Sequence, residues 1–246
     1  MDHLIYTAMS GASAAASRQS VLANNLANAS TQGFRAELSN FRAVPLRGDG
    51  ATTRVFALEA TSGHDDKPGA MQRTGRALDM AAQDKSWFAV QGLDGTEAYT
   101  RDGSFQVSPE GTLTTSTGLM VLSDGGSPID VPQGADIAVG SDGTVTATTD
   151  GQPPSTIGRI KLATPSADDP LQRGEDGLFR TVSQQPIDSD TTARVETGVL
   201  EGSNVNSVET MVGMIAAARQ FDTQMRLLST AQDSDKSAAQ LLSVAG

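Results

Sequence analysis

The amino-acid sequence predicts an α+β fold, with long N- and C-terminal helices that pair as a coiled-coil-like stem and a mainly antiparallel β outer domain between them. Near both ends of the chain, small or apolar residues recur at alternating steps of three and four, the spacing of one helix face. In the middle, Asp-Gly and Glu-Gly dipeptides recur eight residues apart, and such dipeptides favour tight hairpin turns. We therefore expect an N-terminal assembly helix, a connector with an extended piece, a β-rich outer domain and a C-terminal assembly helix, at residues 1–34, 35–73, 74–200 and 201–246.

The N-terminal helix is rich in small residues. Its apolar seam, the stripe expected to face another helix, consists of Ile5, Ala8, Ala12, Ala15, Gln19, Leu22, Leu26 and Ala29. Gly11 inside the helix costs about 1 kcal/mol relative to alanine, and ordering each backbone residue costs about 1 kcal/mol or more. Because alanine buries little apolar surface, we predict that this helix is frayed or disordered in the free monomer and becomes ordered on assembly.

Three asparagines, Asn24, Asn25 and Asn28, fall within five residues near the expected end of this helix. Asparagine is unfavourable inside helices because its amide competes for backbone hydrogen bonds. One interpretation is a frayed helix end before a turn at Gly33. The other is that the amides bond to neighbouring subunits or cap a packed junction. The sequence leaves both open, and we include the three residues among the expected interface residues.

The connector and the middle of the chain are expected to be extended. The connector holds a predicted strand at residues 54–59, after a turn at Gly48–Gly50. Further strands are expected between turn dipeptides, at residues 87–90, 104–107, 112–115, 144–148 and 159–162. The turn dipeptides are Asp94-Gly95, Asp102-Gly103, Glu110-Gly111, Asp142-Gly143 and Asp150-Gly151. Their spacing predicts a meander or small barrel-like sheet. Trp87 and Phe88 alternate across one strand, so one of them should face the core.

The C-terminal helix is predicted to run from about Ser207 to Val244, roughly 55 Å at 1.5 Å per residue. Asn206 occupies the N-cap position, and Glu209 three residues later completes a capping-box-like start. The apolar seam of this helix comprises Met211, Met214, Ala218, Phe221, Met225 and Leu228. A helix of this length with one narrow seam needs a surface to lie against, either the chain's own domain or a helix of another subunit.

Composition and charge argue against several classes of protein. The formal net charge is −11, and the acidic excess lies between the two terminal segments, which disfavours nucleic acid as a partner. The chain has no cysteine, so neither disulfides nor thiolate metal sites can form. No run of residues is apolar enough for a membrane span, and we expect no direct membrane insertion. Residues 7–17 are too small and polar for the apolar core of a cleaved secretory signal peptide.

The sequence gives no indication of an enzyme. No nucleophile motif is present, and only His3 and His64 could serve as a histidine base. His64 and the two aspartates after it form a weak metal-binding pattern that is more often a solvated loop. The run 188–190 begins like a calcium loop, but Ala193 stands where glycine is required. We expect no catalytic residue, metal or cofactor, although sequence alone does not exclude the paired carboxylates of a glycoside hydrolase.

Residues 23–35 read Ala-Asn-Asn-Leu-Ala-Asn-Ala-Ser-Thr-Gln-Gly-Phe-Arg. This segment is similar to one signature of the flagellar axial proteins, the rod and hook subunits of the bacterial flagellum, and segments near the C-terminus are similar to a second. Residues 1–13 and 41–45 resemble the proximal-rod members more than the distal-rod or hook proteins. Ser86 departs from the pattern, because many relatives carry glycine before the aromatic pair. The other matching segments, which extend the resemblance over nearly the whole chain, are 98–103, 176–180, 200–206, 211–215 and 219–221.

The resemblance implies a structural subunit of the proximal rod of the flagellar basal body, the drive shaft that crosses the periplasm. It implies that the terminal helices pair antiparallel and form the inner wall of a tube, with the β domain outside. It also implies export by the flagellar type III apparatus, and contacts with copies of itself, the distal-rod protein and other proximal-rod proteins. The expected subunit-interface residues are Ile5, Ala8, Ala12, Ala15, Leu22, Asn24, Asn25, Leu26, Asn28, Asn204, Asn206, Met211, Met214, Ala218, Phe221, Met225 and Leu228.

Two alternatives stay open. The nearer is a distal-rod or other flagellar axial protein, against which the chain length and residues 1–13 argue. From a different class comes a secreted carbohydrate-binding or carbohydrate-hydrolysing β domain with helical extensions. Deletion of residues 1–34 should separate the classes, because a rod subunit would lose assembly while its β domain stayed folded, and a β-domain binder or enzyme would keep its activity.

Overall fold

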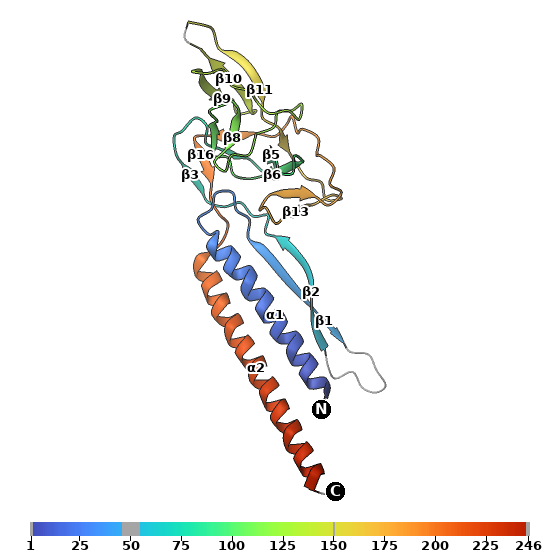
Figure 1. Ribbon diagram of the computed structural model, residues 1–246. Coiled ribbons are helices and arrows are strands. Elements are labelled where there is room, and N and C mark those ends of the chain that lie inside the picture. The colour runs from blue at the N-terminus through green and yellow to red at the C-terminus, as the bar shows by residue number, and fades with distance from the viewer. Residues whose placement is uncertain (1, 46–54, 150, 245–246) are drawn as a thin grey trace. The chain divides into compact units, whose positions relative to one another are not determined.

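The computed structural model describes residues 2–45, 55–149 and 151–244, which form two compact units (Figure 1). The helical unit comprises residues 1–29, 36–63 and 205–246. The β unit comprises residues 30–35 and 64–204. Long terminal helices in contact, together with several small antiparallel sheets, confirm the predicted α+β fold class.

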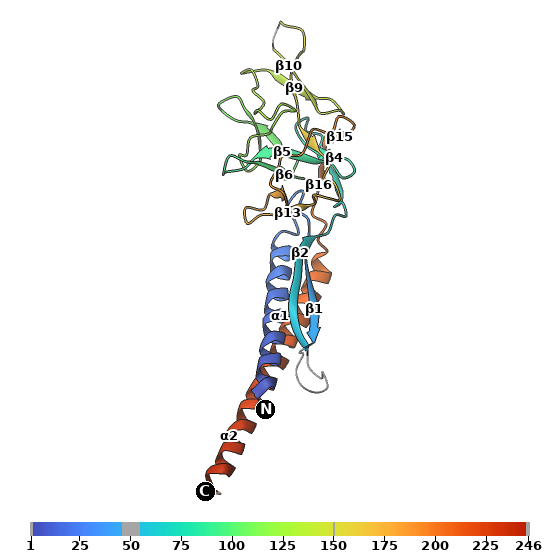
Figure 2. The same ribbon diagram turned by 90° about the vertical axis from the view of Figure 1, so that its right-hand side faces the viewer.

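Two helices dominate the helical unit, α1 (Asp2–Ala27) and α2 (Ser207–Val244), and they lie side by side in opposite directions (Figures 1 and 2). Glycines let them approach closely. A methyl group placed on Gly11 would lie 3.0 Å from Gln224, and one placed on Gly213 would lie 3.2 Å from Leu22. The intrachain helix pair predicted from the two ends of the sequence is therefore present, and small residues set its spacing.

The buried positions of the helix pair are mostly alanines. In α1 they are Ala8, Ala12 and Ala15, which belong to the predicted seam. In α2 the buried residues are Thr210, Ala217 and Ala231, which lie seven and then fourteen positions apart. Thr210 and Ala217 each come one residue before a position of the predicted stripe. Within the predicted α2 seam, Met214, Phe221 and Leu228 are half-buried, whereas Met211 and Met225 are exposed.

The segment between α1 and the β unit contains two strands, β1 (Glu37–Pro45) and β2 (Val55–His64), which pair as a two-stranded sheet. Strand β1 contacts α1. The predicted single extended piece is therefore a paired sheet that belongs to the helical unit, and its second strand extends five residues beyond the predicted end at Glu59. The expected turn at Gly48–Gly50 and the predicted first strand residue, Arg54, lie outside the described residues.

The β unit is built from short antiparallel strands. One sheet has five strands in the order β12 (Leu162–Ala163), β5 (Trp87–Gln91), β6 (Glu97–Thr100), β14 (Phe179–Thr181) and β13 (Leu171–Arg173). Another has three, in the order β11 (Ser155–Arg159), β10 (Thr144–Thr148) and β9 (Asp136–Val139). The two-stranded sheets are β3 (Met71–Arg73) with β16 (Val199–Glu201), β4 (Met80–Ala82) with β15 (Val195–Thr197), and β7 (Phe105–Val107) with β8 (Leu113–Thr115).

The predicted meander describes only part of this arrangement. Strands β9, β10 and β11 follow chain order, but the five-stranded sheet joins segments that are far apart in sequence. Gly95 and Gly143 have φ of 79° and 84°, as the expected hairpin turns require. Gly103 is different, because a methyl group there would lie 1.6 Å from the carbonyl oxygen of Met80. That glycine permits a close backbone approach and does not form the expected turn.

Both aromatic residues of the Trp87–Phe88 pair are buried, because β5 is covered on both faces. Phe88 belongs to a large cluster, where its ring meets Phe105 edge-to-face at 5.1 Å. Trp87 belongs to a second cluster with Tyr99 and Phe179. We expected one of the two rings to face the core, and in the structure both do, each in a different cluster.

Residues 30–35 are an integral part of the β unit. Phe34 is buried, and the N–H of Gly33 donates to the carbonyl oxygen of Glu201 at 2.8 Å. The N–H of Asn204 donates to the carbonyl oxygen of Phe34 at 3.2 Å. A deletion of residues 1–34 would therefore damage the β unit, so residue 29 is the better boundary for the deletion experiment.

Candidate assembly surfaces and the Glu201 cluster

Helix α2 begins with the predicted cap. The side-chain Oδ1 of Asn206 accepts from the N–H groups of Val208 at 3.1 Å and Glu209 at 3.2 Å. These N–H groups have no hydrogen-bond acceptor within the helix, so the Asn206 side chain supplies the acceptor that they would otherwise lack. The hydroxyl of Thr210 also donates to the Asn206 carbonyl oxygen at 2.8 Å.

The asparagine group has an intrachain role at one position. Asn25 is buried, its Nδ2 donates to the carbonyl oxygen of Glu37 at 2.9 Å, and its Oδ1 accepts from the Glu37 N–H at 2.8 Å. The amide thus bonds the edge of β1 as a neighbouring strand would. Asn28 Nδ2 donates to the Asn24 carbonyl oxygen at 3.0 Å, while the Asn24 side chain is exposed. The contacts of Asn25 fit the interpretation in which the amide caps a packed junction, here the one between α1 and β1.

The start of α2 carries an exposed apolar face. Val208, Val212 and Ile215 expose 72%, 62% and 55% of their surface, and Met211 is exposed beside them. These positions follow helical spacing, so the side chains lie on one side of the helix. On α1, Tyr6 and Met9 are also exposed. We call Val208, Met211, Val212 and Ile215 the α2 outer face.

The remaining expected interface residues are distributed between the two units. Those of the helical unit that are half-buried are Ile5, Leu22, Leu26, Asn28, Met214, Ala218, Phe221 and Leu228. Asn206 is exposed apart from its capping bonds. Asn204 belongs to the β unit, where its Nδ2 donates to the carbonyl oxygens of Asp65 at 2.8 Å and Lys67 at 2.9 Å.

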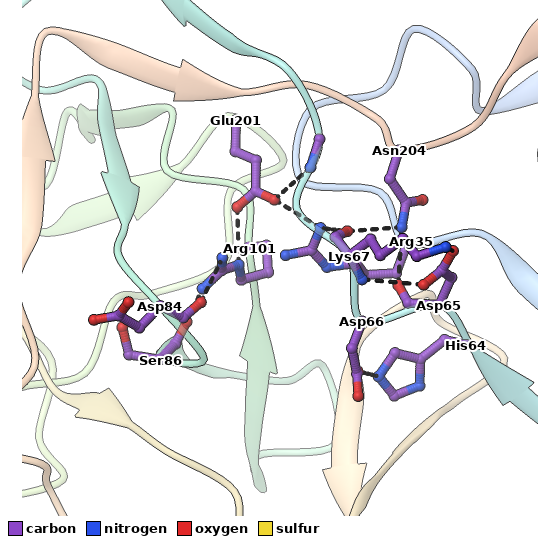
Figure 3. Close-up of polar contacts among 11 residues, drawn as sticks. Arg35, His64, Asp65, Asp66, Lys67, Asp84, Ser86, Arg101, Glu201 and Asn204 are labelled. Atoms are coloured by element: carbon purple, nitrogen blue, oxygen red, sulfur yellow. Dashed lines mark hydrogen bonds and ion pairs between the residues drawn. The ribbon is translucent and has the colours of Figure 1, made fainter.

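The β unit contains a buried ion cluster around Glu201 (Figure 3). One carboxylate oxygen lies 2.7 Å from Arg35 and the other 2.9 Å from Arg101, and all three side chains are buried. The Gly69 N–H donates to the same carboxylate at 2.9 Å. Arg101 also donates to the carbonyl oxygens of Ser86 and Asp84. The Glu201 carboxylate therefore connects its own strand, β16, to three segments that are distant in the sequence, those of Arg35, Gly69 and Arg101.

Sequence reasoning missed this cluster, although Glu201 and Arg35 both lie in the quoted family segments. A pattern of residues along the chain shows neither their burial nor their pairing across more than 160 positions. The departure at Ser86 is accommodated locally, because its hydroxyl donates to the Gln83 carbonyl oxygen at 2.6 Å in a turn where Asp84 has a φ of 51°.

His64 lies at the edge of an aromatic cluster. Its ring meets Phe179 at 4.8 Å and Trp87 at 6.0 Å, both edge-to-face, and its Nε2 lies 2.9 Å from an oxygen of Asp66. Burial lowers the pKa of His64, and Arg35 and Arg173 lower it further against the opposing effect of Asp66. Among the described residues, no group of three histidine or acidic side chains is arranged to hold a metal ion.

Comparison with known proteins agrees with this organisation. Residues 5–35 match the family model described as flagella basal body rod protein, and residues 196–241 match the flagellar basal body rod FlgEFG protein C-terminal model. Residues 81–147 match the flagellar hook protein FlgE/F/G D1 domain. The chain is 47% identical over 253 residues to the flagellar basal-body rod protein FlgF of Escherichia coli strain K12, covering 99% of this chain and 100% of that protein. The chain belongs to the FlgF family of flagellar basal-body rod proteins.

Other relatives support the same assignment. FlgF of Salmonella typhimurium strain LT2 is 45% identical over 99% of this chain and 100% of that protein. FlgG of Bacillus subtilis strain 168, another rod protein, is only 30% identical over 93% of this chain and 95% of its own length. These matches confirm the resemblance predicted from the terminal segments. The family is structural, so the chain is a rod protein and not an enzyme. Neither of its helices, over the described residues, has an apolar stretch that could cross a membrane.

Proposed function

We propose that this chain is a subunit of the proximal rod and polymerises through its terminal helices into the drive shaft that crosses the periplasm. The assembled helices surround the export channel and transmit torque. The chain contacts copies of itself, the distal-rod protein and other proximal-rod proteins. Its membership of a rod-protein family supports this proposal, as does a helical unit that leaves apolar side chains uncovered.

The α2 outer face is the observation that carries the proposal. Covering exposed apolar side chains with another surface stabilises the complex by about 25 cal/mol for each Å² of apolar area removed from water. Contacts between unlike surfaces of successive subunits, repeated by a rotation and a rise, produce an open helical stack. Many such contacts would share the torque, so the removal of any one contact matters little, whereas an unpaired charge placed within the covered face opposes assembly itself.

The expected interface residues divide into two roles under this proposal. Asn24, Met211 and Met225 are exposed and contact neighbouring subunits directly. The buried alanines at positions 8, 12 and 15 act indirectly, by holding α1 against α2 so that the outer surface has a fixed shape. The half-buried seam residues contribute to both.

A charge placed on the α2 outer face tests the proposal. Val212→Asp and Ile215→Asp would be expressed in cells that lack the native gene, and we expect loss of swimming and incomplete rods in electron micrographs of isolated basal bodies. The matched control is Leu93→Asp, because Leu93 is 90% exposed but lies in the β unit. Normal swimming by both α2 variants, in cells with normal amounts of folded protein, would contradict the proposal.

The same proposal includes export by the flagellar type III apparatus, without cleavage of a signal peptide. Its support is the small and polar composition of residues 7–17 and the absence of cysteine, since a chain without disulfides unfolds more readily for passage through a narrow channel. Mass spectrometry of the protein from purified basal bodies should show the same N-terminus as the protein retained in cells with a blocked export apparatus. A shortened N-terminus would contradict this part of the proposal.

A further inference from the structure

The β unit holds an unusual concentration of cations among aromatic rings. The guanidinium carbons of Arg35 and Arg101 lie 6.0 Å and 5.8 Å from the ring centre of Trp87. The guanidinium carbon of Arg173 lies 4.2 Å from the ring centre of Phe34. Cations at these positions are attracted to the ring faces, so the rings stabilise three positive charges in a largely buried place.

His64 is the only titratable group of this cluster that can change its charge near neutral pH. From the other segments, Arg35, Arg101 and Arg173 face the cluster with positive charge, and Glu201 is the buried carboxylate. Both oxygens of Glu201 are already used by Arg35 and Arg101.

The His64 imidazole is within hydrogen-bond distance of one carboxylate, that of Asp66. Asp66 bonds His64 but is 76% exposed, so water screens its charge. The neighbouring Asp65 accepts from the Lys67 N–H at 3.1 Å, and the Lys67 ammonium lies 3.8 Å from the same carboxylate. A proton on His64 would therefore add a positive charge to three arginines with little buried compensation.

We propose that His64 is an acid-sensitive latch, whose neutral ring holds the segment 64–69 against Trp87 and Phe179 and whose protonation releases that segment. The segment is fixed to the β unit by the His64 ring, by the Lys67 and Asp65 carbonyl oxygens that bond Asn204, and by the Gly69 N–H on Glu201. Arg35 also donates to the Lys67 carbonyl oxygen, so loss of the His64 contact frees the start of the segment first. Release would loosen the point at which β2 enters the β unit.

The direction of the pH dependence follows from linkage. The pKa of His64 is lowered in the folded chain from 6.5, so the unfolded chain binds more protons near that pH. The stabilisation by neutral His64 is therefore complete above about pH 6.5 and is lost progressively as the pH falls below it. Most carboxylates stay ionised above about pH 5, which separates their titration from that of histidine.

The chain supplies its own reporter, because Trp87 is its single tryptophan and lies against His64. A protonated imidazole quenches indole fluorescence more strongly than a neutral one. In the full-length protein we expect the thermal unfolding temperature to begin to fall below about pH 6.5. Trp87 fluorescence should fall at the lower pH at which the folded chain binds the proton, together with faster amide exchange at Gly69.

Three variants make the test decisive. His64→Phe keeps a ring against Phe179 but cannot be protonated, so both pH dependences should disappear; His64→Gln is the smaller alternative should the phenylalanine variant fail to fold. His3→Gln removes the only other histidine and should behave as the native chain does. Asp66→Asn removes the contact that favours protonation and should move the fluorescence change to lower pH.

Two results would overturn the proposal. One is an unchanged pH dependence in both His64 variants, which would assign the effect to other groups such as Asp102, whose pKa burial raises. The other is a fluorescence change without any change in unfolding temperature or in Gly69 exchange, because His64 would then titrate without holding the segment.

Discussion

The helical unit and the β unit of this chain are held together by different means. The buried apolar side chains of α1 and α2 are alanines, whereas the β unit buries Phe88, Phe105, Tyr99 and Met80 almost completely. A buried alanine removes little apolar area from water, and a buried phenylalanine removes about 150 Å² or more. The β unit therefore has a core of its own, and the helical unit gains its stability from close approach.

The polar groups of the two units differ in the same sense. The β unit buries an ion cluster in which Glu201 is paired on both oxygens. Among the described residues of the helical unit, the Asn25 side-chain amide is buried and the α2 outer face is in water. The comparison teaches that large buried side chains and a buried ion cluster hold the β unit, while the helical unit leaves a row of apolar side chains at helical spacing in water.

The largest effect is expected from the buried ion cluster. Glu201→Gln leaves Arg35 and Arg101 without their carboxylate in a buried place, and removal of one partner of a buried pair costs about 3–5 kcal/mol. Denaturant unfolding followed by Trp87 fluorescence measures this loss. Glu196→Gln, at an exposed position of β15, should change the free energy of unfolding by no more than about 0.5 kcal/mol. Equal effects of the two variants would mean that the ion cluster is not what distinguishes the β unit.

Overpacking of the helix pair should have the next largest effect. Ala15→Leu inserts a larger side chain where α1 and α2 meet, which costs about 1–3 kcal/mol when the helices cannot separate freely. Ala16→Leu, one residue along on the exposed side, is the control. Far-UV circular dichroism during thermal unfolding, together with swimming, measures the difference. If Ala15→Leu leaves the thermal unfolding of the helical unit unchanged, α1 and α2 are not packed together in the free chain. The sequence analysis predicts such an unpacked N-terminal helix for the free monomer.

The Asn25 amide should contribute less. Asn25→Ala removes two hydrogen bonds to Glu37, each of which contributes about 0.5–1.5 kcal/mol. Hydrogen exchange of the Glu37 amide should become faster, because its acceptor is gone. Asn24→Ala, on the exposed side, should leave that exchange unchanged. If Glu37 stays protected in both variants, β1 does not depend on the amide.

The smallest effect is expected at the start of α2. Asn206→Ala leaves the N–H groups of Val208 and Glu209 without their acceptor, which costs about 1 kcal/mol of helix stability. Asn206→Asp should keep most of it, because a carboxylate accepts the same bonds and is favoured at a helix N-terminus. Far-UV circular dichroism of the full-length variants compares the two. If the Asp variant is as unstable as the Ala variant, the cap does not stabilise the helix by accepting hydrogen bonds from these N–H groups.

The parts of the fold that were predictable depend on local pattern. The spacing of Ala8, Ala12 and Ala15 placed the seam of α1, and Asn206 placed the start of α2, because both signals lie within a few residues of the structure they specify. The hairpin turns at Gly95 and Gly143 are local in the same way. Resemblance then identified the family, since the quoted segments belong to both ends of the chain.

The parts that were not predictable depend on distant residues. Ala217 is buried and a methyl group on Gly213 would lie 3.2 Å from Leu22, so small residues belong to the packed side of α2. The larger residues Met211 and Met225, which gave part of the sequence signal, are exposed. The order of the five-stranded sheet, the burial of Trp87 on a strand covered on both faces, and the role of Gly103 against Met80 have no signal in the neighbouring sequence.

By itself, the order of residues determined that this chain has helical ends around a β-rich middle, because helix and hairpin signals act over a few positions. Only the tertiary structure decided that Glu201 pairs with Arg35 and Arg101, and which side of α2 stays in water. Burial and charge pairing are properties of neighbours in space, and the chain brings those neighbours from positions 100 or more residues apart.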